Sequence, residues 1–376
     1  MTSRLLSTLR VEANAASDKV AWARTVCRMA SHLARQGDEQ NSAAVISSVR
    51  VEFQDNLHPE VACWLMLAEG IVHFCQLRPK EANDRIRRAV AISRAIGIDR
   101  AIPACTAWMA HLNFNEGNFD GMLENLRIAL KSAGFDDHQA GGRAALVMAD
   151  AFHFAGDFAL ARPWYERCRL HAAAEGDETT MSAMLHNVAA FRASNIRLLD
   201  AFGEVELAES RRATIQAQSA YTYDAMLGGE TFKLLLPLLR GQLLVVERKY
   251  MEAMTIFRQI NIAELHSRLT PILQIDISWS LSNLNNITEA TNLLNHAISI
   301  FPLIVDFDDK AYFCSRVAQT AVICNKLDIV DFWRTEASTA LTAHKSTQAS
   351  LLRKLLELGS FPKNDAIFRP ETKKPG

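Results

Sequence analysis

The stretch Gly142–His171, GRAALVMADAFHFAGDFALARPWYERCRLH, decides the fold of this 376-residue chain. It predicts two short amphipathic helices joined by a turn at Gly156-Asp157-Phe158, with Ala149 on the first helix and Ala161 on the second. Small residues let two helix backbones approach closely, and large side chains such as Tyr165 fill the space around that contact. The stretch therefore predicts one antiparallel helix pair.

The same arrangement recurs along the chain: a small residue, a larger residue three positions later, and usually a second small residue twelve positions after the first. The leading small residues are separated by steps of 40, 40, 39, 40 and then 52 residues, and they are Ala30, Gly70, Ala110, Ala149, Ala189 and Gly241. The small residues that we place on the second helices are Ala82, Ala161, Ala201, Ala253 and Ala290. So regular a period predicts a stack of about eight helix pairs.

This pattern resembles the tetratricopeptide repeat, whose signature places small residues and aromatic residues at matching positions on two helices. Its period of about 40 residues is longer than the roughly 34 residues of the standard repeat. Long-period variants of this kind resemble the repeat regions of bacterial MalT-type regulators and peptide-sensing Rap-type proteins, in architecture only. The resemblance implies an all-α fold, a right-handed α-solenoid of about eight antiparallel helix pairs.

The repeat pattern also predicts how the chain is organised. We expect a helical lead-in over 1–20, five repeats over 21–215, an insertion or linker over 216–229, three repeats over 230–358, and a disordered tail over 359–376. The block 230–358 ends in a separate capping helix at about 346–358. The insertion is open to interpretation as a hinge, a lid or a dimer contact.

Composition excludes several classes of partner. A net charge of −1 and a pI of about 6.8 argue against a nucleic-acid binder, which normally carries a basic stripe. The longest strongly apolar stretch, Leu234–Leu239, is far too short to span a bilayer. Seven cysteines without a CxxC pair favour reduced thiols. We therefore expect a cytoplasmic protein with no membrane and no nucleic-acid partner.

No catalytic motif is present. The sequence lacks a phosphate-binding glycine loop, an HExxH motif and a GxSxG motif. The string Gly228-Gly229-Glu230-Thr231-Phe232 resembles the GG(D/E)EF loop of diguanylate cyclases. Thr231, however, replaces an acidic residue, and no strand–helix alternation surrounds the string, so we interpret it as a loop before a helix. We predict no enzyme, no catalytic residue and no cofactor.

Polar residues mark a candidate groove, because the first helix of each pair lines the concave face in this repeat type. The residues that we place there are His111, Asn115, Arg143, Asp150, His153 and His186. Arg143 would pair with a carboxylate of a peptide or of a small anionic ligand. One alternative is a metal site made of His111, Asp150, His153 and His186, although we predict no metal. The other is a solvated surface whose polar groups satisfy one another.

Other inner positions are apolar, and they are Trp64, Phe74, Leu235, Leu238, Trp279 and Cys324. They suit an amphipathic partner helix if they are exposed, and they are core if the superhelix is tightly wound. The lysine and asparagine clamp of chaperone-binding members of the family is absent. We predict a scaffold, adaptor or signalling regulator that binds a protein or peptide in the groove. The alternative is a sensor of a small molecule or signalling peptide in repeats 3–5, and a homo-oligomer is compatible with either function.

Overall fold

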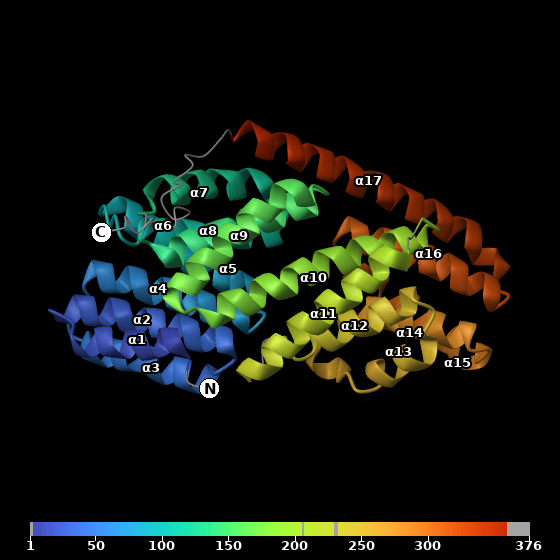
Figure 1. The fold of residues 1–376 in the computed structure, drawn as a ribbon, viewed down its shortest axis with the longest axis horizontal. Coiled ribbons are helices and arrows are strands. Elements are labelled where there is room, and N and C mark those ends of the chain that lie inside the picture. Colours follow the sequence, from blue (N-terminus) through green and yellow to red (C-terminus); the bar gives the residue numbers. More distant parts are fainter. Residues whose placement is uncertain (1–2, 135, 205–206, 229–231, 359–376) are drawn as a thin grey trace, which may run out of the picture. The chain divides into compact units, whose positions relative to one another are not determined.

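The computed structural model describes residues 3–134, 136–204, 207–228 and 232–358 of the chain (Figure 1). Within these ranges the regular structure consists of seventeen α-helices and three short 3-10 helices, and no strand occurs in them. This confirms the predicted all-α solenoid of helix pairs. Gly229, Glu230, Thr231 and the tail 359–376 lie outside the described residues. Our interpretations of the Gly228–Phe232 string as a loop and of the tail as disordered therefore stay predictions.

The chain divides into two compact units, unit 1 (Met1–Met184 and Leu351–Gly376) and unit 2 (Leu185–Ser350). The helices of unit 1 are α1 (Arg4–Asn14), α2 (Lys19–Gln36), α3 (Glu39–Glu52), α4 (Pro59–Cys75), α5 (Pro79–Ala95), α6 (Ile102–Asn115), α7 (Phe119–Ser132), α8 (His138–Phe154) and α9 (Phe158–Glu175). Those that follow are α10 (Glu178–Ala201), α11 (Leu207–Leu227), α12 (Leu235–Val246), α13 (Tyr250–Phe257), α14 (Thr270–Asn283), α15 (Ile287–Ser299), α16 (Phe307–Ile323) and α17 (Val330–Glu357). Both α10 and α17 contribute residues to each unit.

Most pairs turn at one residue with a positive φ, which is the conformation that glycine adopts at least cost. Gly37, Gly117 and Gly156 fill this position in the first, third and fourth pairs, with φ angles of 85, 71 and 86°. The residue that follows each glycine caps the next helix, since its side chain accepts a hydrogen bond from a backbone N–H of the first turn; these caps are Asp38, Asn118 and Asp157. In other pairs the same position holds Leu77, Arg248, Asn285 and Asn325, also with positive φ.

Apart from Ala189 and Ala201, which both lie on α10, the small residues of the repeat pattern lie on helices that pack together in pairs. All eleven are buried. A Cβ built on Gly70 would lie under 3.0 Å from the side chain of Ile86, and a Cβ on Gly241 would lie as close to Phe257. Real Cβ atoms essentially never come so near another atom. Glycine at these two positions therefore sets the closeness of the second and sixth pairs.

The fifth pair differs from the prediction. The chain between Ala189 and Ala201 contains neither glycine nor proline, and α10 continues through the position where the other pairs turn and ends at Ala201. The placement of Ala201 on the second helix of this pair is therefore wrong. Most of the predicted insertion, up to Leu227, belongs to α11. The separate capping helix is also wrong, because 330–357 contain neither glycine nor proline and form the single helix α17.

The inner helices are enclosed. Every residue of α6 from Pro103 to Asn113 is buried, whereas its outer partner α7 buries one face only. The question that the sequence left open at the apolar inner positions is thereby answered case by case. Trp64, Leu238 and Cys324 are core, and the remaining three, Phe74, Leu235 and Trp279, are half-buried.

Unit 1 is closed on itself by contacts between its first helices and the junction of α9 and α10. The N–H of Leu5 donates to the carbonyl of Gly176 at 3.2 Å. Arg28 Nη2 lies 2.5 Å from Glu175 Oε1. Ser3 donates a hydrogen bond to Glu178, and Arg35 donates one to Asp177, just before α10 begins. This closure joins the first helices of unit 1 to the residues where its fourth pair ends and α10 begins. Within the described chain, no helix is both long enough and apolar enough to cross a membrane.

Candidate ligand site on the inner helices

Five of the six predicted groove residues lie on two neighbouring inner helices of unit 1. His111 and Asn115 lie on α6, and Arg143, Asp150 and His153 lie on α8. The two helices pack against each other. The middle of the site is deeper than a surface groove, because His111, Arg143 and Asp150 are all at most 8% exposed. Asn115 is exposed and His153 is half-buried.

Arg143 is the unusual member of this set. Its guanidinium carbon lies 4.0 Å from the centre of the Trp108 ring, a cation–π arrangement across α6 and α8. It makes no hydrogen bond and no ion pair with any residue that the structure describes. Burial, and then the nearby charge of Arg35, lowers the pKa of Arg143 to about 10. Arg143 is thus a charged group, 7% exposed, without a counter-ion.

His111 completes an aromatic cluster beside Arg143. Its ring packs edge-on against Phe74 and Trp108, with centroids 5.0 and 5.6 Å away. Burial, and then the charge of Arg143, lowers the pKa of His111 to about 3, so the ring is neutral near pH 7. Its Nε2 lies 3.4 Å from Asn115 Nδ2, whereas its Nδ1 has no partner in the described chain. Since Asn115 donates to Nε2, the proton of the neutral ring lies on Nδ1.

Asp150 and His153 serve another network. Tyr165, on the outer helix α9, donates its hydroxyl hydrogen to Asp150 Oδ1 at 2.9 Å. His153 Nδ1 lies 3.2 Å from the same hydroxyl. Burial and the charge of Asp150 raise the pKa of Tyr165, which stays protonated. These two groove residues therefore hold the fourth helix pair together.

Arg35 offers a contrast with Arg143. It lies near the end of α2, and its Nη1 donates to Asp177 Oδ2 at 2.9 Å and to Thr180 Oγ1 at 2.8 Å. These bonds and the neighbouring His32 hold the pKa of the Asp177 carboxyl well below its usual range, against the effect of burial. Arg35 and Asp177 thus form a compensated buried ion pair.

A Ser–His–Asp series also occurs in unit 1. Ser3 Oγ lies 2.8 Å from His32 Nε2, and His32 Nδ1 lies 3.5 Å from Asp177 Oδ1, which is the order of hydrolytic triads. Ser3, however, donates its hydroxyl hydrogen to Glu178 at 2.9 Å and accepts from the N–H of Leu6. Both Ser3 and His32 are buried. The series connects α1, α2 and α10 and presents no nucleophile.

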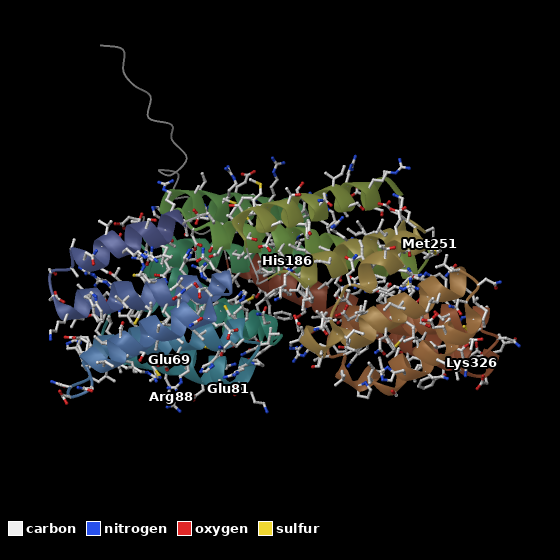
Figure 2. The ribbon with its side chains drawn as sticks, turned by 90° about the horizontal axis from the view of Figure 1, so that it is seen from below. Glu69, Glu81, Arg88, His186, Met251 and Lys326 are labelled. Carbon is white, nitrogen blue, oxygen red and sulfur yellow. The ribbon has the colours of Figure 1, made fainter. Side chains whose placement is uncertain are left out.

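The sixth predicted residue, His186, lies on α10 in unit 2 (Figure 2). Its ring stacks on Phe232 with centroids 4.4 Å apart, and burial lowers its pKa to about 4. In the part of the chain that the structure describes, no three histidine, cysteine or acidic side chains converge to hold a metal ion. The alternative metal site therefore gathers no set of ligands.

Unit 2 buries its own charges in pairs. Asp200 forms ion pairs with Arg248 and with the fully buried Arg316. Asp276 accepts a hydrogen bond from the Tyr312 hydroxyl, and Arg197 Nη2 lies 3.6 Å from Asp276 Oδ2. Beside this network is a pocket of about 390 Å³ whose lining includes Trp279, Ser315, Ala318, Gln319, Val322, Ile323 and Arg334. The buried arginines of unit 2, unlike Arg143, each have a carboxylate partner.

Sequence reasoning missed the residues that give Arg143 its setting. The repeat pattern gives no reason to place Trp108, Arg35 or Asp177 beside Arg143. A charged residue on an otherwise apolar inner helix is a signal that singles out Arg143. The partner of such a residue cannot be identified in this way, because it comes from another helix pair.

No protein-family model matches the sequence, and no curated protein does. Among solved structures, the chain is similar to a Rap protein complexed with Competence and Sporulation Factor. The two are 12% identical, with a TM-score of 0.56 over 90% of this chain and 87% of that one. The apo form of RapI is 13% identical, with a TM-score of 0.48 over 87% of each chain. The first of these likenesses confirms the fold. At such low identity it shows the fold alone, which is the Rap-like helix-pair solenoid expected from the sequence.

Proposed function

We propose that this protein is a non-catalytic regulator, adaptor or scaffold that binds a peptide or a segment of another protein against the inner helices of unit 1. The observation that carries the proposal is the buried, uncompensated guanidinium of Arg143 on Trp108. A buried charge without a partner is costly, and folded proteins keep one mainly where a ligand supplies the opposite charge. The binding reaction would then recover part of the cost of burying Arg143.

The setting of this arginine also supports binding over catalysis. The nearby histidine is neutral, and the buried Asp150 is committed to Tyr165. The fold is shared with a Rap protein that was crystallised with Competence and Sporulation Factor. By analogy with that complex, a short peptide is a fitting ligand for this chain. All seven cysteines are free thiols, and the Sγ atoms of Cys63 and Cys105, 3.8 Å apart, share a hydrogen bond and not a disulfide, which supports a reducing, cytoplasmic compartment.

A sensor of a small molecule in repeats 3–5 is the second candidate. The depth of the site favours it, since Arg143 is only 7% exposed and little of a long ligand would reach it. The two candidates differ in what the site captures. A regulator of protein partners binds a polypeptide, whereas a sensor binds a compound from the low-molecular-weight fraction of a lysate.

The test is a cross-linked pull-down from the native host lysate with three full-length proteins: wild type, Arg143→Glu, and the control Arg88→Glu. Arg88 lies on the outer helix α5 with 61% of its side chain exposed (Figure 2). A polypeptide captured by wild type and control but lost with Arg143→Glu would support the proposal. Equal capture by all three would move the binding surface elsewhere. No captured polypeptide, together with a thermal shift caused by the low-molecular-weight fraction, would favour the sensor.

A further inference from the structure

The donors of Arg143 are free to bind a ligand. The guanidinium carbon lies over the Trp108 ring, 4.0 Å from its centre, and the five N–H groups of a guanidinium lie in the plane of the group. Within the described residues these groups have no acceptor. An arginine that is held by an aromatic face and not by a salt bridge presents a fork of donors in a fixed plane. Such a fork matches a planar acceptor with two oxygens.

The nearby carboxylates do not fill this role. Asp150 accepts from Tyr165, and Asp177 accepts from Arg35 and Thr180. Both lie near enough to raise the pKa of Arg143, yet neither forms an ion pair with it in the described part of the chain. Their effect on the pKa is smaller than the effect of burial, which lowers it overall. The guanidinium of Arg143 thus has nearby carboxylates but, in the described chain, none within hydrogen-bond or ion-pair distance.

A second unused donor lies beside the arginine. The neutral ring of His111 carries its proton on Nδ1, which is buried and has no partner in the described chain. The rings of Trp108 and Phe74 pack edge-on against the His111 ring. One cation and one neutral N–H thus belong to the same aromatic cluster, since both His111 and Arg143 contact Trp108.

The geometry points to a carboxylate, and this inference rests on the function proposed above. We propose that the inner face of unit 1 recognises a carboxylate of the bound segment, gripped by both arms of the Arg143 guanidinium with His111 as the neighbouring donor. A phosphate dianion would bring two charges to one cation, with Asp150 and Asp177 nearby to repel it. A carboxylate carries one charge and has the planar, two-oxygen shape that the fork requires.

Four pools of random hexapeptides test the proposal. One has free C-termini and no acidic side chains, one has amidated C-termini and acidic side chains, one has both kinds of carboxylate, and one has neither. Each pool is passed over immobilised full-length protein, and the bound peptides are counted by mass spectrometry. We expect capture at least about tenfold greater from pools that carry the recognised carboxylate, since a hydrogen bond to a charged group is worth about 1.5–3 kcal/mol.

Variants assign that preference to Arg143. Arg143→Gln should reduce capture of the preferred pool to that of the neutral pool. Arg143→Lys keeps the charge but loses the fork, so its capture of the preferred pool should lie between those of wild type and Arg143→Gln. Arg88→Gln, on the outer helix, should match wild type. A preference for free C-termini identifies the chain end as the source, and a preference for acidic side chains identifies Asp or Glu.

The possible failures are distinct. Equal capture from all four pools, or a preference that survives in Arg143→Gln, would refute the carboxylate site and leave the proposed function standing. No capture by wild type from any pool would refute peptide binding itself, and the inference would fall with it. Circular dichroism of each variant confirms that its helices are intact.

Discussion

Replacement of Arg143 by methionine tests whether the buried charge serves the fold or a ligand. Methionine is long and apolar, so it fills most of the same space beside Trp108 without the charge. Arginines that stabilise a fold have a carboxylate partner, and replacing such an arginine leaves a buried carboxylate without a counter-ion. Arg143 has no such partner among the described residues. We therefore expect Arg143→Met to stabilise unit 1.

The magnitude follows from the site. A pKa lowered from 12.5 to about 10 corresponds to roughly 3 kcal/mol against the charged form in the folded state. The contact with Trp108 returns about 1–2 kcal/mol of this, as estimated for partly desolvated cation–π pairs. Arg143→Met should therefore raise the free energy of unfolding by about 1–2 kcal/mol. The matched variant Arg35→Met breaks the pair with Asp177 and should lower it by about 3–5 kcal/mol.

Urea unfolding at pH 7, followed by circular dichroism, measures both variants against wild type. The expected pattern is opposite signs: a higher midpoint for Arg143→Met and a lower midpoint for Arg35→Met, with unchanged slopes. A loss of 2 kcal/mol or more in Arg143→Met would refute the reasoning. Arg143 would then be a structural residue with a partner in the folded chain, and it would no longer indicate a ligand.

Three further predictions concern packing and pH. Ala149→Leu overpacks the fourth helix pair, where Ala149 is fully buried, and should cost about 1–3 kcal/mol in urea unfolding; an unchanged midpoint would contradict the close contact of α8 and α9. Gly70→Ala forces a Cβ against Ile86, so it should cost about 1–2 kcal/mol even though alanine favours helices; a more stable variant would show that Ile86 moves aside freely. His111→Leu should remove part of the acid sensitivity of unit 1. Because the folded pKa of His111 is about 3 and that of an unfolded histidine about 6.5, the unfolded chain binds more protons between these values, and stability falls as the pH decreases through this window. Between pH 7 and pH 5 wild type should lose about 2 kcal/mol through this residue, and parallel stability–pH curves for the two proteins would refute the assignment.

The sequence predicted the fold class well, because the repeat period depends on local chemistry. Turn residues such as Gly37 and Gly156 and their capping neighbours act within a few positions of the chain. Where those signals were missing, the prediction failed. Neither α10 nor α17 contains a glycine or a proline, so both helices run longer than a period of 40 residues implies.

The candidate site could be predicted only in part. The inner positions of His111 and Arg143 follow from the repeat alignment, and the structure places both against Trp108. Their depth could not be foreseen, because it depends on how neighbouring helix pairs pack, as where Phe74 of the second pair lies against His111 of the third. For the same reason the sequence could not separate Asp150, which serves Tyr165, from Arg143, which has no partner in the described chain.

The closure of unit 1 changes how such an array should fold and unfold. An open stack of repeats has contacts between neighbours only, so it frays from its ends and its stability is a sum of local terms. In unit 1 Ser3 reaches Glu178 and Arg28 reaches Glu175, contacts that span more than 140 positions of the chain. Bringing such distant residues together costs loop entropy before any contact is gained, which slows folding. The first four helix pairs should therefore behave as one cooperative block with late closure, and removal of α1 alone should loosen pairs far beyond it.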